Sequence, residues 1–209
     1  MSHVWIDFRG IQDAFMRAKG IDYFENSRRA IYVQQRYAIE NPRKFAGYGE
    51  HCWGITASDG PGPETLKLDG VEREFFDYLG RGVPYGPDDG MIAPWAVLAS
   101  LPFAPEIVLP AVDLFINEAK LKDAGSYGFK ASFNPTHRAR SGDPGGWWIS
   151  PRHFGLNQGP IVLMIENYRT GSPWRLMRGC PYVRKGLQQA GFGGGWLAED
   201  ATVLPSERR

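Results

Sequence analysis

The chain has 209 residues and a nearly balanced charge, with 24 basic and 23 acidic side chains. This length is sufficient to bury one sizeable core. Because neither sign of charge dominates, the composition does not favour a nucleic acid or an anionic membrane surface as partner, and a neutral small molecule or polymer fits better. The 26 glycines and 16 prolines, with 13% aromatic residues, predict helices joined by long, shaped loops.

Other features of the sequence narrow the class further. No apolar run approaches the ~20 residues of a membrane span, and the start of the chain shows no export signal. The two cysteines, Cys52 and Cys180, match no metal-ligand spacing, so they form either one disulfide or two separate buried thiols. We therefore expect no metal, no cofactor, no membrane span and no nucleic-acid partner.

The first 42 residues predict two helices. Apolar side chains over residues 5–19 indicate the first, which Gly20 ends. Residues 22–40 repeat their apolar positions at helical spacing, and the Asn-Pro step at residues 41–42 stops the second helix.

Residues 47–62 form a loop that combines five glycines with aromatic and titratable side chains. Tyr48 and Trp53 would offer flat amphipathic faces of the kind on which sugars stack. Glu50 and Asp59 add acid–base capacity, and His51 could hold or pass a proton near neutral pH. Asp59 also fits an ordinary surface turn.

Shorter elements are predicted downstream. Residues 65–87 indicate a hairpin or an extended piece. Pro94 starts a buried apolar helix, and Pro105 opens another that Pro110 must restart or kink. Residues 127–137 and 143–154 form aromatic, Gly/Pro-rich loops. Helices starting at Pro160, Pro173 and Pro181 are expected to follow, the last ending at Gly191, with a polar tail beyond Leu197.

This order of loops and buried helices is typical of an α-hairpin toroid or solenoid whose loops gather at one end to make the site. Hydrolysis of a glycosidic bond needs one protonated and one ionised carboxyl group. Asp59, Asp89 beside Asp88, and Glu166 within an apolar helix are the candidates. Asp88 and Asp89 also fit a plain turn, and Glu166 also fits a buried ion pair with Arg169 or Arg175.

Five segments together resemble the glycoamylase-like family of bacterial proteins: residues 22–42, 52–62, 88–106, 127–135 and 155–171. The strings WGITASDGP and NQGPIVLMIENYR are the most specific of these. The family includes β-1,2-glucan hydrolases with an (α/α)6 toroid and members about twice this length. The resemblance implies that residues 1–197 are the C-terminal part of such a toroid domain and that the protein is periplasmic or exported. Residues 198–209 are the polar tail.

We therefore expect a mainly α fold, a partial (α/α)6 toroid, that belongs to an inverting hydrolase of β-glucans, most simply β-1,2-linked. Asp59, Asp89 and Glu166 are the expected catalytic carboxylates. The substrate-binding residues expected around them are Tyr48, His51, Trp53, Trp95, Asn134, Trp147, Asn167 and Arg169. A glucan is the expected partner, together with a missing N-terminal half or a second copy. The rival readings are a non-catalytic glucan-binding unit and an exo-hydrolase of α-glucans.

Overall fold

The computed structural model describes residues 2–122, 124–125, 127–138 and 146–198. Its helices are α1 (Ser2–Trp5), α2 (Ala14–Lys19), α3 (Tyr23–Glu40), α4 (Pro94–Leu98), α5 (Pro105–Asp113), the π-helical turn η1 (Leu114–Glu118), α6 (Gly155–Arg169), α7 (Ser172–Gly179), α8 (Pro181–Gln189) and α9 (Gly195–Ala198). Its strands are β1 (Glu64–Leu68), β2 (Val71–Phe75), β3 (Phe133–Arg138) and β4 (Trp147–Ile149). The expectation of a mainly helical fold is confirmed.

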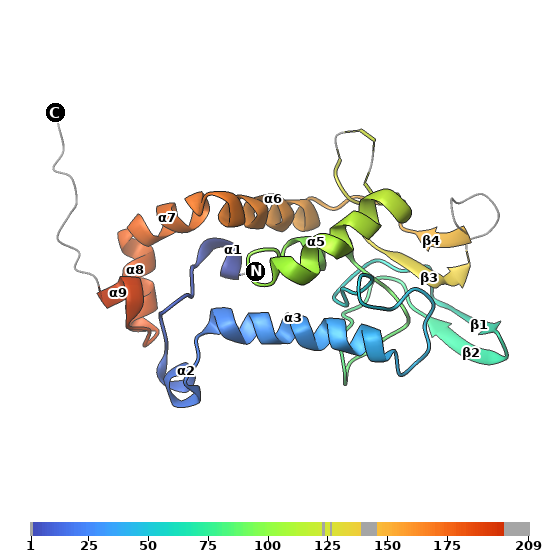
Figure 1. The fold of residues 1–209 in the computed structure, drawn as a ribbon, viewed down its shortest axis with the longest axis horizontal. Helices are drawn as coiled ribbons and strands as arrows, with labels where there is room; N and C mark the ends of the chain where they lie inside the picture. The colour runs from blue at the N-terminus through green and yellow to red at the C-terminus, as the bar shows by residue number, and fades with distance from the viewer. Residues whose placement is uncertain (1, 123, 126, 139–145, 199–209) are drawn as a thin grey trace.

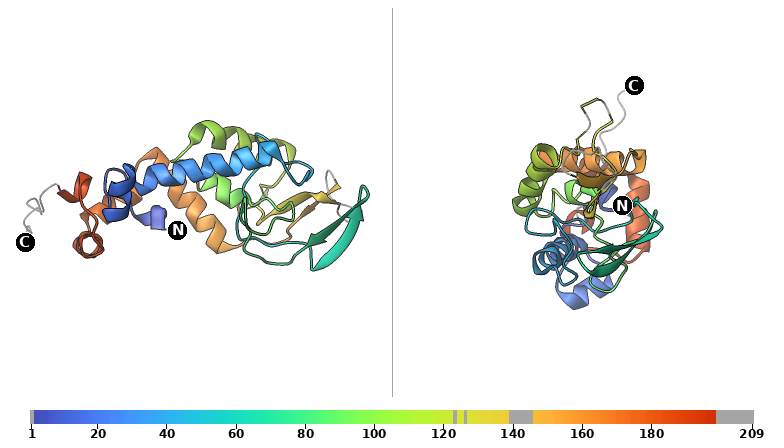
Figure 2. Two further views of the ribbon diagram at one scale, coloured as in Figure 1. Left: turned by 90° about the horizontal axis from the view of Figure 1, so that it is seen from below. Right: turned by 90° about the vertical axis from the view of Figure 1, so that its right-hand side faces the viewer.

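The molecule is elongated, with helices along its length and the strands gathered at one end (Figure 1). Helix α3 runs along one side, α6 and α7 run along the other, and α5 lies between them. Figure 2 shows the same separation from below, with the strands at one end and α8 and α9 at the other. The strands form two separate antiparallel hairpins, β1–β2 and β3–β4.

Helix α3 follows the sequence prediction for residues 22–40 closely. The Asp22 carboxylate caps its first turn by accepting from the Glu25 backbone N–H at 2.8 Å, and Asn41 ends it in the left-handed region at φ 42°. Such a capping carboxylate satisfies a backbone donor that the helix itself leaves free. Ile31 and Ala38 face the core, whereas ion pairs such as Arg36–Glu40 lie on the outer face.

The single helix predicted for residues 5–19 is wrong. The structure has α1 at Ser2–Trp5 and α2 at Ala14–Lys19, separated by eight residues that are not helical. Asp13 explains the late start of α2, because its side chain accepts from Met16 N at 2.8 Å and so caps a new helix. Gln12 is held in a backbone bridge to Gly193, which draws this segment toward the C-terminal helices.

The main core lies where the loops meet α4, α5 and η1. Its fully buried members include Trp53, Val97, Val108, Phe115 and Phe133. The predicted helix starts at Pro94, Pro105, Pro173 and Pro181 are confirmed to within one residue. Each proline occupies one of the first two helical positions, where its missing N–H costs nothing.

Helix α6 begins five residues before the predicted start at Pro160, which lies inside it. The N–H that Pro160 lacks would have bonded to the carbonyl of Leu156, and Leu156 is 64% exposed, so water can serve that carbonyl. The loop assignment of residues 127–137 and 143–154 was also incomplete, since β3 and β4 pair there. Residues 139–145 and the tail after Ala198 lie outside the described residues.

The two cysteines are separate thiols. Cys52 is buried, Cys180 is partly buried, and neither is in a disulfide. Burial raises the pKa of the Cys52 thiol to about 12, so this group stays protonated and behaves as a small apolar side chain. Among the described residues, no helix combines the length and the apolar character that a bilayer crossing needs.

Candidate functional site

Loops from three parts of the chain converge beside the two hairpins. Asn134 Nδ2 on β3 donates to the backbone carbonyl of Asp89 at 2.9 Å. Ser132 Oγ, just before the same strand, donates to the carbonyl of Asp59 at 2.8 Å. The structure therefore brings Asp59, Asp89 and Asn134 together at one end of the helices, and we call this region the hairpin end.

Asp89 is held in a buried ion pair with Arg81. Arg81 Nε and Nη2 donate to the two Asp89 carboxylate oxygens at 2.6 and 2.7 Å, and the two side chains are 0% and 1% exposed. The Phe76 N–H donates to one of the same oxygens at 3.1 Å. Because both oxygens are occupied and neither meets solvent, this geometry favours a positioning role for Asp89 over proton transfer.

Asp59 is also buried, but its partner reaches solvent. Ser150 Oγ donates to Asp59 Oδ2 at 2.6 Å, and Arg152 Nη1 donates to Oδ1 at 2.7 Å. The Arg152 side chain is 58% exposed whereas that of Asp59 is 2% exposed. A ligand that displaces this guanidinium would therefore meet the carboxylate directly.

Asp88, the neighbour of Asp89, receives two phenol hydroxyls. Tyr48 Oη donates to Asp88 Oδ1 at 2.7 Å and Tyr37 Oη donates to Oδ2 at 2.9 Å. The Gly90 N–H adds a third bond at 3.1 Å. Burial, reinforced by Asp88, raises the pKa of Tyr37 to about 12 and that of Tyr48 well above its ordinary value. Both phenols consequently remain hydrogen-bond donors at any physiological pH.

A hollow of about 410 Å³ opens above Asp88, which we call the Asp88 pocket. This volume lies in the range of small-molecule sites. Its walls come from the loop after α3, strand β2 and the loop before Asp88: Arg43, Phe45, Val71, Glu72, Arg73, Glu74, Phe76, Pro87 and Asp88. The pocket thus offers an aromatic ring together with donors and acceptors.

The expected aromatic platforms are placed differently from one another. Trp53 is 1% exposed and Tyr48 is 9% exposed, so in this structure both rings belong to the core and are not available for stacking. Trp95 and Trp147 are half-buried, and Trp147 stacks on the buried Phe133 ring at 5.9 Å. His51 is exposed on the loop before Trp53.

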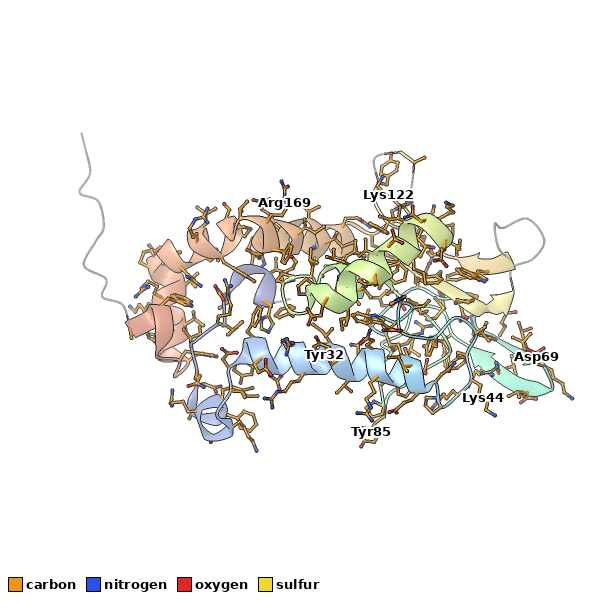
Figure 3. The ribbon with its side chains drawn as sticks, in the orientation of Figure 1. Tyr32, Lys44, Asp69, Tyr85, Lys122 and Arg169 are labelled. Carbon is orange, nitrogen blue, oxygen red and sulfur yellow. The ribbon has the colours of Figure 1, made fainter. Side chains whose placement is uncertain are left out.

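Glu166, Asn167 and Arg169 are not brought to the hairpin end. Asn167 is buried and bonds to the Val4 carbonyl and the Trp174 N–H, which ties α6 to α1 and α7. Glu166 is half-buried and accepts a hydrogen bond from Thr170 on its own helix, so neither expected arginine partner engages it. Figure 3 shows Arg169 on the outer side of α6, away from Lys44 and Asp69 beside β1–β2.

Four residues of the site were missed by sequence reasoning: Tyr37, Arg81, Ser150 and Arg152. In the sequence, Tyr37 counted only as one of the apolar positions that repeat along the helix predicted for residues 22–40. Arg81 and Arg152 belong to no recognisable motif. Arg152 lies 93 residues from Asp59 and Tyr37 lies 51 residues from Asp88. Only folding brings such partners together, and a single sequence holds no signal for them.

The fold is similar to that of solved bacterial structures described as putative glucoamylases. Residues 1–181 match the model of the family described as "Putative glucoamylase". The chain belongs to this family.

Its relatives are longer proteins. The chain is 36% identical over 171 residues to an exo β-1,2-glucooligosaccharide sophorohydrolase (non-reducing end) of Parabacteroides distasonis, which covers 82% of this chain and 20% of that protein. A crystal structure described as a "putative glucoamylase" from Bacteroides uniformis is 38% identical with a TM-score of 0.74, over 94% of this chain and 40% of that one. The endo-β-1,2-glucanase of Chitinophaga pinensis, solved with sophorotriose and glucose, is 31% identical with a TM-score of 0.73, over the same shares of the two chains.

Proposed function

We propose that this chain is part of a glycoside hydrolase that acts on β-1,2-linked glucans. Its relatives of 36% and 31% identity are named for hydrolysis of β-1,2-linked glucose chains. The observation that carries the proposal is the hairpin end itself, where Asp59 and Asp88 sit in different hydrogen-bonding surroundings and Asp88 lines an open pocket. Two carboxyl groups in unlike surroundings are what glycosidic hydrolysis needs.

Asp59 is the best-placed catalytic carboxylate among those expected. Its oxygens are fixed by Ser150 and Arg152, and the exposed Arg152 gives a path from solvent. Asp89 supports the site by fixing Arg81 and, through its carbonyl, Asn134. An inverting mechanism places the second carboxyl group roughly 6.5–9.5 Å away across the sugar. If the chain is part of an (α/α)6 toroid, as we propose, the part of the ring opposite the hairpin end supplies that second carboxyl group.

One arrangement of the same residues favours a second function, a non-catalytic glucan-binding unit. Asp89 is fully engaged by Arg81, and Glu166 lies on the far part of α6 beside Thr170. Of the three expected catalytic carboxylates, Asp59 is then the one whose arginine partner reaches solvent among the described residues. A single carboxylate of this kind suits binding better than turnover.

The test uses the purified 209-residue chain in long incubations with β-1,2-glucan, β-1,3-glucan and starch, with new reducing ends measured. We expect slow hydrolysis of β-1,2-glucan and no hydrolysis of β-1,3-glucan or starch. Asp59→Asn should lower that rate by ~100-fold or more, because it removes a proton-transfer group. Glu166→Gln is the matched control and should change the rate by less than about threefold, given that its carboxylate bonds within its own helix.

Other outcomes point elsewhere. Binding of β-1,2-linked oligosaccharides without any hydrolysis would support the binding unit, and hydrolysis of starch would support an α-glucan hydrolase. A loss of rate with Glu166→Gln equal to that with Asp59→Asn would instead place Glu166 in the catalytic site. Melting temperatures of both variants separate loss of chemistry from loss of fold.

A further inference from the structure

A second hollow of about 280 Å³ adjoins the Asp88 pocket, and we call it the Lys44 hollow. It is lined by residues from the loop after α3, the β1–β2 turn and β3, and Figure 3 shows Lys44 and Asp69 at this end of the molecule. Phe45 and Arg73 line both hollows. The two cavities are therefore neighbours that share one wall.

Arg73 is held firmly in that wall. Its guanidinium lies 4.7 Å from the centre of the Phe45 ring, and it donates to the backbone carbonyls of Arg43 at 3.2 Å and Lys44 at 3.1 Å. A guanidinium has five N–H donors in a fixed plane, and these two contacts leave others for a ligand. Because the group is already positioned, little side-chain entropy would be lost when a ligand binds.

The mixed charges that line the two hollows favour a neutral ligand over a strongly charged one. Arg43 and Arg73 face Glu72, Glu74 and Asp88 in the Asp88 pocket, while Lys44 and Arg73 face Asp69 in the Lys44 hollow. Neither sign dominates, so a charged ligand would meet like charges on part of each wall. A neutral ligand whose groups both donate and accept hydrogen bonds, such as a row of sugar hydroxyls, satisfies both kinds of wall residue.

We propose that the Asp88 pocket and the Lys44 hollow are subsites for two consecutive glucosyl units, with Arg73 donating to both. This proposal rests on the proposed function and adds to it the residue that couples the two units. The β1–β2 hairpin, which carries Arg73, becomes the element that sets how many sugar units are held. A ligand of one unit gains contacts in one subsite, whereas a longer ligand gains the second subsite and the shared guanidinium.

The test measures the affinity of the chain for glucose and for the β-1,2-linked disaccharide and trisaccharide by calorimetry or NMR titration. The wild-type chain should bind the two oligosaccharides at least tenfold more tightly than glucose. Arg73→Met keeps the apolar stem over Phe45 and removes the donors. It should weaken oligosaccharide binding by about 10–100-fold, as expected for hydrogen bonds from a charged group, and glucose binding by about threefold or less. Arg29→Met, the same change at an exposed ion pair of α3, should alter none of these affinities.

Asp69→Asn provides a second variant that does not depend on the Arg73 anchor. Asn tolerates the left-handed backbone of this position, φ 50°, and the change removes one charge from the Lys44 hollow alone. It should weaken oligosaccharide binding and spare glucose or affect it less. The inference is overturned if Arg73→Met leaves oligosaccharide affinity within twofold, or if it weakens glucose and the trisaccharide equally. Hydrolysis of β-1,2-glucan that persists in that case would leave the proposed function standing while this assignment fails.

Discussion

Asp88 and Asp89 are adjacent in sequence, yet their surroundings assign them different tasks. Asp89 turns inward to a guanidinium that no solvent reaches, and Asp88 lines an open pocket while two phenols hold it. Gly90, at φ 84°, follows the pair and donates its N–H to Asp88 Oδ1. An added side chain at Gly90 would also approach the Phe45 ring to 2.8 Å. The pair Asp88–Asp89 thus supplies both a buried ion pair with Arg81 and one wall of the Asp88 pocket.

The contribution of the Arg81–Asp89 ion pair can be tested by measuring the free energy of unfolding. Arg81→Met leaves the Asp89 carboxylate buried without its partner, and breaking a buried pair in this way costs about 3–5 kcal/mol of unfolding free energy. Arg81 also donates to the carbonyl of Ser58 at 2.7 Å, so the double variant Arg81→Met/Asp89→Asn should recover only part of the loss. Urea unfolding followed by circular dichroism measures both. An Arg81→Met chain as stable as the wild type would show that the pair is dispensable.

The phenols that hold Asp88 predict how stability changes in alkali. In the unfolded chain Tyr37 ionises near 10, whereas in the folded protein its pKa is raised to about 12, first by burial and then by Asp88. Between these values the unfolded chain binds fewer protons, so stability is complete below pH 10 and falls as the pH rises toward 12. Tyr37→Phe should show a smaller alkaline loss of stability than the wild type.

The absorbance of tyrosinate gives an independent measurement of the same effect. In the folded wild type, Tyr37 and Tyr48 should be among the phenols that ionise late, and Tyr37→Phe should remove one late-titrating phenol. If all phenols titrate together near their ordinary pKa while the chain remains folded, the hydrogen bonds to Asp88 are not as described.

Secondary structure was predictable wherever a local signal decided it. The stop at residues 41–42 and the helix-initiating prolines 94, 105, 173 and 181 each act through their immediate neighbours. The prediction failed at residues 5–19, where Asp13 caps a helix of its own, and at Pro160, which an exposed turn of α6 accommodates. In both cases the sequence allowed two helix starts, and the structure has the one that was not predicted.

The site was predictable only in part. Asp59, Asp89 and Asn134 could be selected because each belongs to a segment that is rich in turn residues and aromatics, and the structure does bring them together. Their partners could not be selected, because Arg81 and Arg152 acquire meaning from the carboxylates that they meet after folding. Trp53 was expected to bind sugars because it is aromatic, but the structure buries it in the core.

Helix α5 and turn η1 carry apolar side chains on both faces. Val108, Ala111 and Phe115 are buried, whereas Leu109 and Ile116 are 52% and 36% exposed. The exposed pair consists of Leu109 on α5 and Ile116 on η1, seven residues apart in sequence. Such exposed apolar side chains are candidates for contact with another element.

The lengths of the relatives indicate what such a surface binds. This chain spans 40% of the length of the Bacteroides uniformis and Chitinophaga pinensis proteins, and 20% of the length of the Parabacteroides distasonis hydrolase. In those proteins further chain is available to pack on the equivalent helices. In this chain the helices run along one long molecule with the strands gathered at one end (Figure 1), and the exposed Leu109 and Ile116 could contact such a segment.

We therefore predict that hydrolysis of β-1,2-glucan by this chain rises at least tenfold when it is mixed with the segment of the Bacteroides uniformis protein that it does not match. The added segment supplies the opposing wall that holds the sugar in register, and misplacement by about 1 Å costs ~100-fold in rate. Reducing-end assays measure the rise, and size-exclusion chromatography measures the complex. Leu109→Ser/Ile116→Ser should fold but form less complex and show a smaller rise. Full turnover by the chain alone, unchanged by the added segment, would mean that the hairpin end already contains the whole catalytic site.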